Sequence, residues 1–468
     1  MGDGLLQPAA GWNTGDYKYK MMNHIKEMTS GATLPLIFNF TIPVLLGSLL
    51  QQTYSLVDAA IVGQCLGINA LAAVGASSSV IFLILGFCNG CCGGFGIPVA
   101  QKFGAHHYEA MRRLVFVGSR LSLFMSVGLA LMTSLLCSSI LQLMQTPQLI
   151  FEDAYHYLLI TFIGIPATFF YNLYSSIIRA LGDSKTPFLF LVLTTVLNIL
   201  LDFLFIIVFG WGVPGAAIAT VTAQAVSALL CRSYMYRHYA VLQLQPNERR
   251  FSFHLARVLL TIGAPMGLQF SITAIGCIML QSSNNALGTA CVAAYTTAIR
   301  IEMFFLCMLE SIGITMATFC GQNYGAGKPE RIWQGVKSAS VLALGYIVPV
   351  VVILWLFSES IATWFVDASQ HEIIDMVAYF LHVIVSFFPF LGLLCILRYS
   401  IQGVGYTSLA LFSGVAEMVA RALVALFAVP QWGFGVVCLG DVTAWIFAVL
   451  FLVPAFRHVY RNISAGKR

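Results

Sequence analysis

The sequence predicts an all-α membrane protein in which twelve transmembrane helices form two parallel six-helix repeats around a central cavity. Three observations support this fold class: the composition, the placement of basic residues and an internal repeat. Hydrophobic residues make up 59% of the 468 residues, charged residues only 9%, and the mean hydropathy is +0.85. Soluble domains carry about 25% charged residues. The net charge of +5 is too small and too dispersed for nucleic-acid binding. Most of the chain is therefore expected to lie in a lipid bilayer.

Twelve apolar stretches have about the 20 residues that a helix needs to cross a bilayer. They are continuously apolar, without the period-two alternation of a membrane β-barrel, so we expect helices. The stretches are 35–61, 70–98, 114–138, 155–178, 188–209, 213–235, 256–286, 290–319, 338–358, 376–397, 406–429 and 434–456.

Basic residues lie on one side of the predicted membrane. Of the 24 Lys and Arg residues, all except Arg300 and Arg421 lie in or beside the two terminal segments and the even-numbered connections; Arg398 is expected at such a border. Basic loops stay in the cytoplasm. The pattern predicts a multi-pass protein of the cell (inner) membrane with both termini cytoplasmic. The first 30 residues lack the apolar core of a secretory signal.

The second half of the chain repeats the first. Trp211-Gly212 returns as Trp432-Gly433 after 221 residues, and Pro43 corresponds to Pro265. Because each half holds six spans, both halves enter the membrane in the same direction, related by a pseudo-two-fold axis along the membrane normal. The predicted parts are a cytoplasmic N-terminal segment (1–30), an N-lobe (31–235), a cytoplasmic interlobe linker (236–255), a C-lobe (256–458) and a cytoplasmic tail (459–468).

Small residues and prolines mark particular spans. Gly86, Gly90 and Gly94 are spaced four apart, which favours a close-packing helix face over a hinge. Pro43 and Pro265 lie inside the first span of each half, where a proline permits a kink. We predict that these two positions are hinges, with a purely structural bend as the alternative.

Ionisable residues inside the spans are candidates for function, because a carboxylate in the bilayer core costs at least ~2.5 kcal/mol. In the second half, Glu417 and Arg421 are four apart, which suits an ion pair within one helix. Arg300 and Glu302 point in different directions and need partners on other helices, of which Glu310 is one candidate. These five residues predict a gating or structural polar network in the C-lobe.

The first half carries acids that have no base nearby on their own helices. Asp58 and Asp202 are of this kind, and Asn198 lies one helical turn before Asp202. Asn172 and Thr220 add neutral oxygens from the same lobe. Hard cations prefer oxygen ligands, and neighbouring buried acids bind protons. This set predicts a cation-coupling site, with Na⁺ at Asp58, Asn198 and Asp202 or a proton in its place; structural hydrogen bonding is the alternative. No catalytic residue and no cofactor other than the coupling ion is expected.

Several motifs resemble the multidrug and toxic compound extrusion (MATE) family of bacterial efflux proteins. The resemblance covers about residues 27–460. The motifs are Leu56-Val57-Asp58-Ala59-Ala60-Ile61-Val62-Gly63, Arg179-Ala-Leu-Gly182-Asp183, Asn198-Ile-Leu-Leu-Asp202 and Gly321-Gln-Asn-Tyr-Gly-Ala326. The resemblance implies two six-helix lobes that export amphipathic, often cationic compounds in exchange for Na⁺ or H⁺. It also implies a cation site at the positions matching Asp58, Asn172, Asn198, Asp202 and Thr220.

The sequence therefore predicts a secondary transporter and not an enzyme. It would export small amphipathic or cationic molecules by cation-coupled antiport and alternating access, as a monomer in the lipid bilayer. Stretch 256–286 lacks the acid that another branch of the family carries there, and Glu310 is the candidate replacement. The first alternative is a flippase or exporter of a lipid-linked or polysaccharide precursor, which would need a strongly basic cavity. The second, a membrane enzyme such as a prenyl transferase, would need Asp clusters or paired His ligands, and the sequence has neither.

Overall fold

The structure is a computed structural model that describes residues 27–466, so most of the predicted N-terminal segment lies outside it. Residues 27–466 are nearly all helical and contain no strand, which confirms the predicted fold class. The first half contains α2 (Thr33–Leu66), α3 (Ile68–Gly104), α4 (Tyr108–Leu143), α5 (Gln148–Ile163), α6 (Ile165–Ala180), α7 (Lys185–Asp202), the π-helical turn η1 (Phe203–Val208) and α8 (Gly212–His238). The short turns η2 (Ala240–Leu242) and η3 (Pro246–Glu248) form the linker. The second half contains α9 (Phe253–Asn285), α10 (Thr289–Gly325), α11 (Pro329–Ala362), α12 (His371–Ser386), α13 (Phe388–Val404), α14 (Thr407–Leu423), η4 (Val424–Ala428), α15 (Val429–Trp432), α16 (Phe434–Val437) and α17 (Leu439–Ser464).

Two predicted spans are broken. Within residues 27–466, ten helices are long and apolar enough to cross a membrane, and two bent pairs bring the total to as many as twelve. The predicted span 155–178 is split between α5 and α6 with a bend of 46°, and 376–397 is split between α12 and α13 with a bend of 50°. Pro166 and Pro389 stand at the start of the second helix of each pair, where proline can begin a helix but cannot continue the preceding one.

The last helix is longer than predicted. The tail was expected to begin at residue 459, but α17 continues to Ser464. No proline or glycine interrupts residues 455–464, and the helix ends only before Gly466, which has a φ of 67°. Here helix propensity, rather than hydropathy, decides where the element ends.

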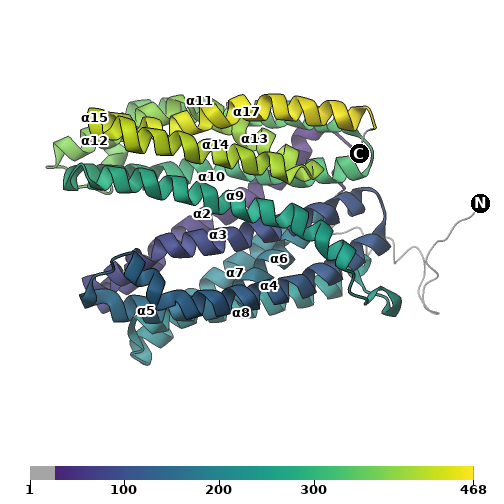
Figure 1. The fold of residues 1–468 in the computed structure, drawn as a ribbon, viewed down its shortest axis with the longest axis horizontal. Coiled ribbons are helices and arrows are strands. Elements are labelled where there is room, and N and C mark those ends of the chain that lie inside the picture. Colours follow the sequence, from purple (N-terminus) through teal and green to yellow (C-terminus); the bar gives the residue numbers. More distant parts are fainter. Residues whose placement is uncertain (1–26, 467–468) are drawn as a thin grey trace, which may run out of the picture.

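The helices form two lobes that pack against each other (Figure 1). The N-lobe, α2–α8, and the C-lobe, α9–α17, each enclose a separate apolar core. We call the end at which α2 begins and α17 ends the terminal end, at the right of Figure 1, and the opposite end the far end. The lobes meet toward the terminal end, and their helices diverge toward the far end. The start of α2 crosses over: Ile37 and Phe40 belong to the core of the C-lobe.

The glycine face on α3 packs against the other lobe. A Cβ atom added at Gly90 would lie 2.6 Å from the carbonyl oxygen of Met266 on α9, and one added at Gly94 would lie 2.5 Å from Gly263 Cα. The close-packing role predicted from the spacing is therefore confirmed. The helices α2 and α9 continue through Pro43 and Pro265. The predicted hinge role of these prolines stays a prediction.

Candidate functional site

The two N-lobe acids face each other across the packed helices α2 and α7. Asp58 lies near the far end of α2 and is half-buried, whereas Asp202 is the last residue of α7 and has no exposed surface. The two carboxyl groups lie close enough for their charges to interact. Two neighbouring charged carboxylates repel each other, and a proton or a cation bound between them would relieve that repulsion.

Neutral groups surround the acid pair. The Asn198 side chain lies 3.2 Å from the Thr220 hydroxyl on α8. With its amide nitrogen turned toward Asp202, Asn198 donates to Asp202 Oδ2 at 2.9 Å and to the Tyr54 hydroxyl at 3.1 Å, and its oxygen accepts from the Thr220 backbone N–H at 3.1 Å. This orientation satisfies both ends of the amide. The sequence-predicted residues Asp58, Asn198, Asp202 and Thr220 are thus brought together from three helices.

One oxygen of each acid is left without a partner. Asp58 Oδ1 and Asp202 Oδ1 are buried and accept no hydrogen bond from any described residue. Buried polar atoms are nearly always paired, so these two oxygens mark a place for a ligand that supplies positive charge. A small apolar cluster that includes Ile61, Ile206 and Val213 packs around the neighbouring turns. The site can therefore hold a proton or one small cation, and in these apolar surroundings the bound charge would interact strongly with the two acids.

Two tyrosines complete the site and were not predicted. The Tyr54 hydroxyl lies 3.2 Å from Thr220 Oγ1, and Tyr157 on α5 lies close to both acids. Tyr54 precedes Asp58 by one helical turn, and this spacing was the available signal. Tyr157 lies on another helix, so no spacing in the sequence could indicate that it belongs to the site. Asn172 on α6 is half-buried and makes no side-chain hydrogen bond to a described residue. Its predicted membership of the site remains a prediction.

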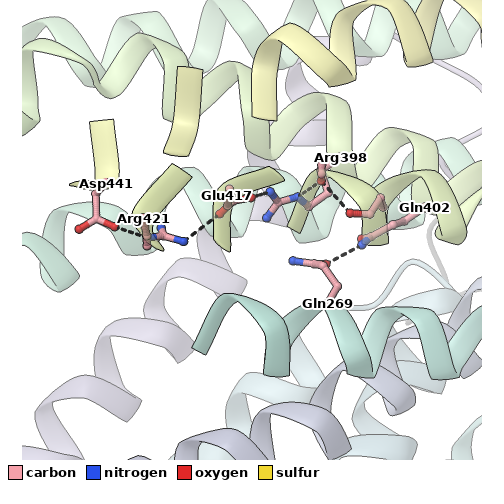
Figure 2. Close-up of polar contacts among 8 residues, drawn as sticks. Gln269, Arg398, Gln402, Glu417, Arg421 and Asp441 are labelled. Atoms are coloured by element: carbon pink, nitrogen blue, oxygen red, sulfur yellow. Dashed lines mark hydrogen bonds and ion pairs between the residues drawn. The ribbon is translucent and has the colours of Figure 1, made fainter. Parts of the chain in front are cut away.

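A chain of buried charges runs through the C-lobe (Figure 2). Glu417 forms an ion pair with Arg398 of α13 and a longer one, at 3.5 Å, with Arg421 on its own helix. Arg421 Nε in turn lies 2.7 Å from Asp441 Oδ1 at the start of α17. Beyond Arg398 in Figure 2, Gln402 donates to Gln269 Oε1 at 3.0 Å. The predicted pair Glu417–Arg421 exists, but each partner makes a closer contact with another helix.

The other members of the predicted C-lobe network, Arg300, Glu302 and Glu310, form no ion pair with a described residue, and their part in gating stays a prediction. Arg300 is exposed and forms no ion pair with a described residue. Glu302 is buried near Arg421 and Asp441 without bonding to either, and Glu310 is solvent-accessible but lies near Arg398 without bonding to it. Arg398, expected at a membrane border, is instead only 7% exposed inside α13, because Glu417 compensates its charge.

A small cavity of about 90 Å³ lies between the lobes. Residues of both lobes line it, including Met266 and Phe270 from α9 and Tyr399 from α13. Arg179 is the only charged residue of its lining. Arg179 lies in the last turn of α6, beside the fourth connection, and its Nη2 donates to Ser176 Oγ at 3.0 Å. The wall of this cavity is therefore largely apolar.

A larger cavity, about 860 Å³, lies at the terminal end beside the linker and the start of α4. Glu248 of η3 borders it and forms an ion pair with Arg112 at 2.5 Å. Although burial disfavours the charged form, hydrogen bonds from Arg112 and from the Gln245 backbone hold the pKa of Glu248 below its ordinary value. This ion pair anchors the linker to the N-lobe. Within residues 27–466, no group of three or more His, Cys, Asp or Glu residues could hold a metal ion.

Two helical lobes with an acid pair buried in one of them are an arrangement typical of secondary transporters. The MatE family model matches the chain twice, over residues 43–204 and 254–427. The chain therefore belongs to the MatE family of transporters. The double match agrees with the internal repeat.

Curated relatives and solved structures agree with this assignment. The chain is 28% identical over 379 residues to the probable multidrug resistance protein YpnP of Bacillus subtilis (strain 168), covering 81% of this chain and 84% of that protein. It is 30% identical over 340 residues to the probable multidrug resistance protein YoeA of the same organism, covering 71% of this chain and 73% of that protein. The fold is similar to a crystal structure of MATE in complex with MaL6, with a TM-score of 0.86, 24% identity, and coverage of 94% of this chain and 99% of that one.

Proposed function

We propose that this protein is a cation-coupled antiporter that exports amphipathic or cationic drugs and toxic compounds by alternating access, with H⁺ or Na⁺ as the coupling ion. The observation that carries the proposal is the pair of unpartnered buried oxygens on Asp58 and Asp202. The multidrug resistance proteins among the relatives support the substrate class. In this proposal the protein works as a monomer in the cell membrane, and the terminal end faces the cytoplasm.

The acid pair couples the two fluxes through its charge. With the lobes apart at the far end, a cation or proton reaches Asp58 and Asp202 and neutralises them. Loss of their repulsion lets α2 and α7 draw together, which changes the N-lobe wall and lowers the affinity for cargo. The lobes then separate at the terminal end, where the cation leaves and a new cargo molecule enters. Tyr54 and Asn198 position the acids throughout.

The largely apolar cavity favours drug export over the flippase alternative. A pyrophosphate-linked lipid would need several basic groups in the interlobe cavity, and Arg179 is the one charge in the lining that the structure describes. At about 90 Å³ this cavity is smaller than a drug-sized site, so cargo would bind there only in a state with the lobes further apart. The Met and aromatic side chains of its wall suit varied amphipathic guests.

Efflux assays on Asp→Asn variants test the proposal. We expect Asp58→Asn and Asp202→Asn each to reduce efflux of a cationic dye from whole cells at least about tenfold, since a neutral amide cannot alternate between charged and neutral states. Asp367→Asn, in an exposed loop, is the matched control and should export at the normal rate. Normal export by both site variants, at equal amounts of protein, would refute the assignment.

A further inference from the structure

The terminal end holds two glutamines that the internal repeat relates to each other. Gln101 lies in the last turn of α3, and Gln322 lies 221 residues later in the last turn of α10. Neither belongs to the acid site or to the C-lobe charge chain. Each one reaches into the opposite lobe.

The hydrogen bonds of these glutamines are reciprocal. Gln101 Nε2 of the N-lobe donates to the carbonyl oxygen of Gly403 in the C-lobe at 3.0 Å. Gln322 Nε2 of the C-lobe donates to the carbonyl oxygen of Ala180 in the N-lobe at 2.9 Å. Ala180 and Gly403 are themselves equivalent in the repeat, like the nearby pair Gly182 and Gly405. The same bond is therefore made twice, once in each direction across the lobe interface.

The backbones also approach each other reciprocally. A Cβ atom added at Gly104 would overlap the carbonyl group of Gln322, and one added at Gly325 would overlap the carbonyl group of Gln101. Between them, Gly321 packs against Ala100. Only glycine permits the ends of α3 and α10 to come this close. The pseudo-two-fold axis thus passes through a contact that exists only while the lobes are closed at this end.

We propose that Gln101 and Gln322, seated by Gly104 and Gly325, form a paired latch that holds the terminal end closed. Two features separate a latch from ordinary packing. Both bonds join side chains to carbonyl groups at helix ends, which water can satisfy once the lobes part, so breaking them costs little. Both bonds also join opposite lobes, so they break when the lobes separate and do not contribute to the fold within either lobe.

The N-terminal segment reinforces one half of the latch. Gln322 Oε1 accepts from the backbone N–H of Met28 at 2.8 Å, and Asn323 Nδ2 donates to the Met28 carbonyl oxygen at 3.1 Å. Gln322 is fully buried as a result, while Gln101 is half-buried. We expect loss of the Gln322 amide to open the terminal end at least as much as loss of the Gln101 amide.

Distances between spin labels test the latch without substrate or coupling ion. The inference rests on the proposed alternating access but not on the acid site. Nitroxides attached through a genetically encoded amino acid at Lys102 and Ser408, exposed at the terminal end on opposite lobes, report closure there. A second pair at Asn69 and Asn285 reports the far end.

Gln101→Met and Gln322→Met keep the side-chain length and remove the donor, and Gln322→Met also removes the acceptor of the Met28 N–H. Each should lower the ratio of closed to open terminal ends about fivefold, and the double variant about 25-fold, the effect of one and two ordinary hydrogen bonds. Gln281→Met removes a similar amide bond within α9 near the far end and should leave the ratio unchanged.

The glycines provide a second, independent series. Gly104→Ala and Gly325→Ala should abolish the closed population, whereas Gly128→Ala and Gly345→Ala, where an added Cβ meets nothing within 4 Å, should not. Unchanged terminal-end distances in the double glutamine variant and in both latch glycine variants would overturn the proposal. The far-end pair tests alternating access separately, because its distance must shorten when the terminal end opens.

Discussion

Glu417 forms ion pairs with two buried guanidinium groups, those of Arg398 and Arg421. Arg421 also forms an ion pair with Asp441. Removing the charge of Glu417 would leave buried Arg398 without its ion-pair partner. We expect Glu417→Gln to lower the free energy of unfolding by about 3–5 kcal/mol, the usual cost of breaking a buried ion pair. Thermal denaturation in detergent measures this as a lower melting temperature.

Glu302→Gln is the matched control for that measurement. Glu302 is buried in the same region but forms no ion pair with a described residue, so its replacement should change stability by less than about 1 kcal/mol. Equal losses in the two variants would show that burial of the carboxyl group, and not the ion-pair chain, sets the stability there.

For individual residues, the sequence could predict contacts within one helix but not contacts between helices. Asn198 and Asp202 share a face because they are four residues apart, and Glu417 and Arg421 do so for the same reason. The nearest partner of Glu417, Arg398, lies on another helix, and no spacing in the sequence indicates it. Tyr157 was missed for the same reason.

The linker packs against the N-lobe through both of its turns. Val241 and Leu242 of η2 belong to the N-lobe core, and η3 adds the ion pair between Glu248 and Arg112. Glu248 is excluded from solvent by Arg112, but the adjoining cavity of about 860 Å³ brings water close. We therefore expect Glu248→Gln to cost about 2 kcal/mol at neutral pH, below the range for fully buried pairs.

The same ion pair makes stability depend on pH. Because the folded-state pKa of Glu248 lies below its ordinary value of 4.5, its contribution is present above about pH 4.5 and is lost as the pH falls through the folded-state pKa. The melting temperatures of the wild type and of Glu248→Gln should converge as the pH is lowered from 5 to 3. A constant difference over that interval would contradict this account.

Hydropathy located every span but did not find the breaks within two of them. Long apolar stretches predict that a segment crosses the membrane, whereas the course of the backbone depends on single residues such as Pro166 and Pro389. The π-helical turns η1 and η4 begin at Phe203 and Val424, which the repeat makes equivalent. Both halves thus carry a π-helical turn at the same position of the repeat. An alignment of the two halves could have predicted the second turn from the first.

For the whole molecule, the duplication predicted two lobes, and the lobes are present. The sequence could not indicate how far apart they lie at either end, since that depends on contacts between segments hundreds of residues apart. The reciprocal glutamine bonds appear only when α3 and α10 are placed side by side. A structure closed at one end agrees with one state of a transport cycle, and the proposed exchange of ion for cargo concerns the passage between states.

Flux measurements on purified protein in liposomes test that exchange most directly. With a cationic dye on one side and an imposed H⁺ or Na⁺ gradient, the wild type should move dye against the flow of one of these ions, and reversing that gradient should reverse the dye flux. The double variant Asp58→Asn/Asp202→Asn should show no gradient-dependent flux. Dye movement that ignores both gradients, or that persists unchanged in the double variant, would contradict the account.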